Sequence, residues 1–163
     1  MTTPLSGAIK ALLQEYRRMI DELLVVINPI PKPVLVMELP TSTTDEDCKS
    51  IQAILTHVVR SGYVYTAYFE ELAGNPVVLP KRKREPNSAA YSKALNDMYV
   101  HCEQFFKRNP QLPLAVYDGG KTVKVSWGQV FDGEQLFEHA IVHVMRHRLQ
   151  IENALKHNSF KSV

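Results

Sequence analysis

Residues 133–155 have the sequence GEQLFEHAIVHVMRHRLQIENAL, in which apolar residues recur three and four positions apart. This spacing is the period of one face of an α-helix, so the segment predicts a long amphipathic helix. His139, His143 and His147 follow one another in it at intervals of four residues. Residues four apart are about 40° apart around a helix axis, so the three imidazoles share one stripe.

Three earlier segments show the same period and predict three more helices, over residues 5–27, 45–74 and 88–109. Side chains that can cap the N-termini of the second and third of these are Thr43, Thr44 or Asp45, and Ser88. Four amphipathic helices without a βαβ alternation predict an all-α protein, a four-helix bundle with long crossover loops.

Two connections between the expected helices have their own signals. Residues 28–44 contain four prolines, which remove backbone donors, and we expect a crossing loop there. Before the last helix, residues 114–117 and 122–127 are rich in β-formers and flank Asp118-Gly119-Gly120. This pattern predicts a short β-hairpin or an extended loop with its turn at the glycines.

The length of 163 residues fits one domain, over residues 1–163. The formal charge of +2 is too small for the basic field that nucleic-acid binding needs, so we expect no nucleic-acid partner. No apolar run is long enough to span a bilayer and the N-terminus lacks a signal-peptide pattern, so we expect no membrane partner and a cytoplasmic location.

Two short features have plain interpretations. The basic run over residues 81–84 lies between Pro80 and Pro86, and we interpret it as a solvated loop rather than a nuclear signal or a phosphate patch. Cys48 and Cys102 have no Cys-x-x-Cys spacing, so neither a disulfide framework nor a cysteine zinc cluster is expected.

Histidines carry the strongest chemical signal. Two imidazoles at positions i and i+4 can bind one ion, whereas His139 and His147 are two turns apart and cannot easily do so together. A third ligand must then come from another helix, where His57 lies among apolar residues. Two alternatives stay open at this stage, a solvated stripe on the last helix and a hydrogen-bonded core histidine at position 57. His101 and His157 have weaker contexts.

The sequence resembles the DinB/YfiT-like metal-binding four-helix bundles. The resemblance rests on residues 54–59, ILTHVV, and residues 143–151, HVMRHRLQI, within the whole helical layout. In that family one His of the second helix and a His-x-x-x-His pair of the fourth bind a divalent ion, and Arg-Gly-Gln commonly follows the pair. Arg148 and Gln150 match this pattern, while Leu149 replaces the glycine and puts close packing near the second ligand in doubt.

The resemblance implies His57, His143 and His147 as ligands of a divalent metal ion, with zinc or nickel expected, and His139 as a neighbour or alternative ligand. It also implies a homodimer. Better understood members of the family look like thiol S-transferases or hydrolase-like enzymes. A metal-dependent transferase or hydrolase, with a low-molecular-weight thiol and a small electrophilic substrate, is therefore one hypothesis.

The competing hypothesis is a non-catalytic scaffold or interaction protein that the ion stabilises. No nucleophile motif or phosphate loop decides for catalysis, so the catalytic residues stay unassigned. Candidate supporting side chains for the site are the carboxylates Glu70, Glu71 and Glu138 and the phenols Tyr63, Tyr65 and Tyr68. Each has a simpler interpretation, as a surface charge or as core packing.

Overall fold

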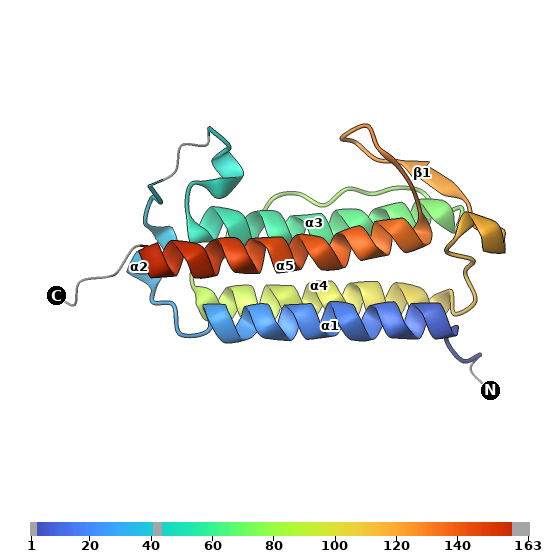
Figure 1. The fold of residues 1–163 in the computed structure, drawn as a ribbon, viewed down its shortest axis with the longest axis horizontal. Helices are drawn as coiled ribbons and strands as arrows, with labels where there is room; N and C mark the ends of the chain where they lie inside the picture. Colours follow the sequence, from blue (N-terminus) through green and yellow to red (C-terminus); the bar gives the residue numbers. More distant parts are fainter. Residues whose placement is uncertain (1–2, 41–43, 158–163) are drawn as a thin grey trace.

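The structure is a computed structural model that describes residues 3–40 and 44–157. Four long helices run side by side within it (Figure 1): α1 (Gly7–Ile27), α3 (Ile51–Leu72), α4 (Ser88–Arg108) and α5 (Gly133–His157). In Figure 1 α3 and α5 lie above α1 and α4, and the buried apolar faces of all four form one core. The predicted long helices are confirmed, and the described chain is mostly helical with one small sheet.

Aromatic side chains hold α3, α4 and α5 together. The rings of Phe106 and Phe137 stack with their centroids 5.1 Å apart, and Phe69 packs against both. Gly62 allows α3 to approach its neighbours closely, since a Cβ atom there would lie 2.0 Å from the sulfur of Met98. Within the described ranges, no helix is both long and apolar enough to cross a bilayer.

The helix caps differ from the predicted ones. Ser50 caps α3 by accepting a hydrogen bond from the Ala53 N–H at 3.0 Å, while Asp45 caps the short 3-10 helix η1 (Glu46–Cys48) instead. Asn87, rather than Ser88, caps α4. Ser88 already lies inside the helix, where its hydroxyl donates to the Ile30 carbonyl at 2.6 Å. Of the other two candidates, Thr44 lies before η1 rather than at the start of α3, and Thr43 lies outside the described residues.

The proline-rich connection is not wholly a loop, because it contains the short helix α2 (Lys32–Val36). Pro33 lies in the first turn of this helix, where a missing N–H costs no intrahelical hydrogen bond. The chain then returns past the start of α3, where the Leu39 N–H donates to the Lys49 carbonyl at 2.8 Å.

A hairpin precedes α5, but its turn is not at the predicted glycines. Strands β1 (Thr122–Lys124) and β2 (Val130–Asp132) pair antiparallel, and the turn between them contains Gly128 at φ +93°. Gly119, at φ +84°, instead ends the 3-10 helix η2 (Val116–Asp118), so residues 114–117 form no strand. The Ser126 N–H donates to the Tyr68 hydroxyl at 2.8 Å and so attaches the hairpin to α3.

Candidate metal centre

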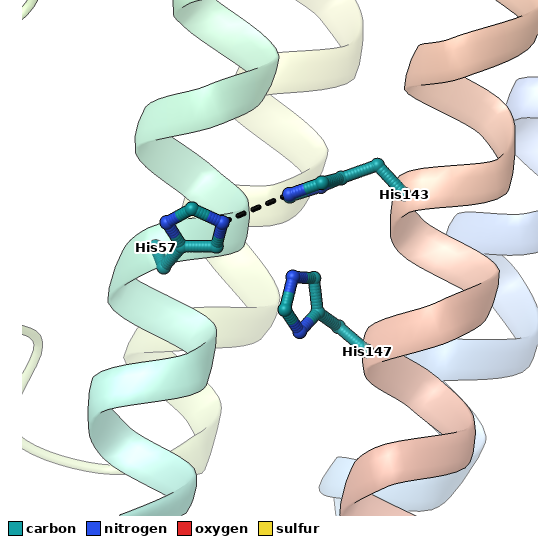
Figure 2. A group of neighbouring side chains, drawn as sticks. All are labelled: His57, His143 and His147. Carbon is teal, nitrogen blue, oxygen red and sulfur yellow. Dashed lines mark hydrogen bonds between the residues drawn. The ribbon is translucent and has the colours of Figure 1, made fainter. Parts of the chain in front are cut away.

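Three imidazoles meet between α3 and α5. Figure 2 shows His57 projecting from α3 toward His143 and His147, which project from α5. The Nε2 atoms of His57 and His143 are 2.9 Å apart, and one nitrogen from each of the three rings lies within 4.8 Å of the others. A tetrahedral ion with N ligands at 2.0–2.1 Å needs N···N distances of about 3.3 Å, so small side-chain shifts suffice to hold one.

Core packing on each helix directs these rings to one place. Ile54 and Val58 are buried in the core, and His57 lies at the edge of the same face of α3. On α5 the buried Ala140 and Val144 place His143 at the corresponding edge. Because the two helices pack against each other, the histidines meet where the core opens to solvent.

An acidic side chain orients His57. The Oδ2 atom of Asp47, in η1, lies 2.9 Å from Nδ1 of His57, and the other carboxylate oxygen pairs with Arg82. A carboxylate only accepts, so Nδ1 carries the proton and Nε2 can present its lone pair to the site. This carboxylate–histidine arrangement is the usual support of a metal-binding imidazole.

An amide orients His147 in the same way. Nδ1 of His147 lies 2.9 Å from Oε1 of Gln150, so it donates there and leaves Nε2 free to bind. The side chain of Leu149 is 44% exposed and points away from the core, while Arg148 pairs with Glu22 of α1 at 2.9 Å. An exposed leucine at position 149 is therefore compatible with the hydrogen bond between His147 and Gln150.

His143 is more deeply buried than His147, its neighbour on α5. Burial, followed by the nearby His147 and His57 rings, lowers the pKa of His143 to about 2. Burial also lowers the pKa of His147. Both imidazoles are therefore neutral at pH 7, which is the state that binds a metal ion. Among the described residues, Nδ1 of His143 has no hydrogen-bond partner.

The buried imidazole makes stability depend on pH. In the unfolded chain His143 takes up a proton near the model-peptide pKa of 6.5, whereas the folded protein takes it up only near pH 2. Since the unfolded state binds more protons, the free energy of unfolding of chelator-treated protein should fall as the pH drops below about 6.5. The expected slope for this group is up to about 1.4 kcal/mol per pH unit.

Urea unfolding at several pH values measures this slope. His143→Gln should flatten it, whereas Val144→Ala, a core change on the same helix, should lower stability by a similar amount at every pH. An unchanged slope in His143→Gln would contradict the buried neutral imidazole.

Asp47 leads to a second prediction. Asp47→Asn removes the charged acceptor of the His57 proton, and we expect zinc affinity to fall about 10- to 100-fold, as for other partners of metal ligands. Glu46→Gln is the matched control, because Glu46 lies in the same 3-10 helix and pairs with Lys49 instead. Competition against a chromophoric chelator measures both variants, and equal affinities for Asp47→Asn and the unaltered protein would refute the role of Asp47.

The other candidate residues lie outside the cluster. His139 stacks on Trp127 with ring centroids 5.6 Å apart, and His101 contacts Tyr63 at 5.1 Å. His157 donates to the Asn153 carbonyl at 2.8 Å. Of the three glutamates considered, Glu70 pairs with Arg108, and Glu71 and Glu138 are exposed.

Of the phenols considered, one contacts the histidine cluster. Tyr65 and Tyr68 are buried as core packing predicts, yet Tyr65 also contacts the ring of His143 at 5.6 Å. The sequence analysis did not identify Asp47 as a partner of His57. Its possible signal is the acidic cluster Asp45-Glu46-Asp47, ten residues before His57.

Comparisons with known proteins identify no family. No protein-family model matches the chain, and neither the curated proteins nor the solved structures include a match.

Proposed function

We propose that the protein binds one divalent metal ion through His57, His143 and His147. The observation that carries this proposal is the convergence of one nitrogen from each of three imidazole rings. In two of these rings the other nitrogen has an acceptor: Asp47 accepts from His57, and Gln150 accepts from His147. These acceptors fix the tautomer in which the opposite ring nitrogen faces the site with its lone pair. Zinc and nickel are the ions we propose first, because both accept imidazole ligands.

We further propose that the site is enzymatic, as in the DinB-like proteins that the sequence resembles. An ion held by three imidazoles keeps a coordination position at which a thiol or a water becomes more acidic. An open pocket of about 350 Å³ adjoins His57 and His143, so a small substrate can reach the site. The proposed activity is a thiol S-transferase or hydrolase reaction on a small electrophile, in a homodimer.

Within such a reaction the chain's own residues have separable roles. Asp47 and Gln150 keep two ligand rings in place, and Tyr65 contacts His143 from the side of the pocket. Burial raises the pKa of the Tyr65 hydroxyl, so this group stays protonated at neutral pH and can donate a hydrogen bond.

Metal analysis and an activity screen test the two parts separately. Protein purified without a polyhistidine tag should contain close to one zinc or nickel ion per chain after incubation with metal and desalting. A screen of electrophiles against several small thiols, and against water, should then show turnover that a chelator abolishes and the metal restores. Turnover that is insensitive to chelation would reject the role of the ion. Metal binding without turnover in any arm would favour the non-catalytic scaffold.

A further inference from the structure

The pocket beside the histidines has aromatic walls. Tyr65 and Trp127 meet edge to face with centroids 6.2 Å apart, and His139 stacks on Trp127 at an interplanar angle of 25°. The indole N–H of Trp127 donates to the Gln129 side chain at 2.8 Å, so the ring is held by the hairpin. Although 44% exposed, it is therefore fixed at the pocket mouth rather than free on the surface.

The charged side chain that lines this pocket is basic, and the nearby carboxylate of Asp47 is already paired with His57 and Arg82. Arg60 lines the pocket, and among the described residues of the lining Ser61 and Ser126 are the uncharged polar side chains apart from the rings. No carboxylate is among the described residues that line the pocket. Within the described ranges Arg60 also has no ion pair with any acidic side chain. Such a pocket favours an anion and disfavours a cation.

We propose that this pocket binds a small aromatic anion, with its ring against Trp127 and Tyr65 and its charge toward Arg60 and the histidine cluster. The inference rests on the proposed function, since it names the class of substrate that the same site accepts. Flat rings suit the pocket because aromatic pairs gain energy beyond the area they bury. An anionic donor such as a carboxylate or thiolate then lies on the side where the three histidines converge.

Calorimetric titration with three matched probes tests this proposal. Benzoate has both features, cyclohexanecarboxylate lacks the aromatic ring, and benzamide lacks the charge. For the zinc-loaded protein we expect benzoate to bind about 2- to 10-fold more tightly than cyclohexanecarboxylate, the range typical of an aromatic contact. We also expect it to bind more tightly than benzamide.

Variants assign each preference to a residue. Trp127→Leu should remove the preference for benzoate over cyclohexanecarboxylate, and Trp127→Phe should restore part of it. Tyr117→Leu is the control, because Tyr117 is an exposed aromatic residue that does not line the pocket. Arg60→Met should lower the affinity for benzoate by about two- to fivefold, the range for an exposed ion pair, and leave the affinity for benzamide unchanged.

Two results would overturn the proposal: equal affinities for benzoate and cyclohexanecarboxylate, or an unaltered ring preference in Trp127→Leu. Zinc is titrated first, in the absence of the three probes, so that a failure of zinc binding is distinguished from a failure of probe binding. The ring preference is then measured in metal-free protein as well, where Trp127 and Tyr65 still form the pocket wall. A preference that persists there supports the pocket even if zinc does not bind.

Discussion

Replacing His143 with alanine should abolish stoichiometric zinc binding. The three rings form a triangle in which the centroid of His143 is 4.9 Å from that of His57 and 4.5 Å from that of His147, so the loss of His143 leaves two ligands on different helices. The expected loss of affinity exceeds the roughly 10- to 100-fold that removal of a ligand's outer partner causes. Competition with a chromophoric chelator, together with the metal content after desalting, measures the effect.

His139→Ala is the matched control for this experiment. It removes a histidine of the same helical stripe, one turn before His143, whose ring stacks on Trp127 instead of joining the cluster. We expect zinc affinity within a few-fold of the unaltered protein. Equal losses in both variants would mean that the helix presents histidines to zinc without a defined site, and circular dichroism confirms that each variant is folded.

Zinc should raise the thermal stability of the protein by a large margin. Only the folded chain brings α3 and α5 together, so an ion that joins their histidines stabilises the folded state alone. At a free zinc concentration 100 times the Kd, the gain is about 2.7 kcal/mol. For a domain of this size that corresponds to a rise in Tm of roughly 5 to 10 °C.

Differential scanning calorimetry with buffered zinc measures this shift. The His143→Ala variant should show almost no zinc-dependent shift, whatever its own Tm. A similar shift in that variant would place the stabilising zinc elsewhere, for example at surface histidines, and would argue against the bridge between α3 and α5.

The helices could be predicted because their signal is local. Ile141, Val144 and the other apolar residues of α5 recur at the helical period, and burial of that face is what forms the helix. The caps were less predictable because neighbouring residues compete for the same role. Asn87 and Ser88 are both good N-caps, and only the extended backbone at Asn87 decides between them.

The hairpin was expected in the right segment but with the wrong turn. Both Gly119 and Gly128 adopt a positive φ, and strands of three residues carry too little pattern to choose between them. The consequence for the site is considerable, because the turn at Gly128 is what brings Trp127 to the pocket.

Within the candidate site, contacts between residues close in the sequence were easier to predict than contacts between distant segments. His143 and His147 form a local pair on one helix, and His57 was identified from its apolar context and the family resemblance. Asp47 could not be found in this way, because its contact with His57 depends on how the segment that contains η1 returns to the start of α3. The same holds for Arg82, in the loop that was interpreted as solvated, which pairs with Asp47.

X-ray absorption spectroscopy of the zinc-saturated protein, prepared without a polyhistidine tag, tests the central claim most directly. The account predicts one zinc per chain, with three imidazole nitrogens at about 2.0–2.1 Å and one further light-atom ligand. A zinc ion with fewer than three imidazole ligands, or with sulfur from Cys48, would contradict it.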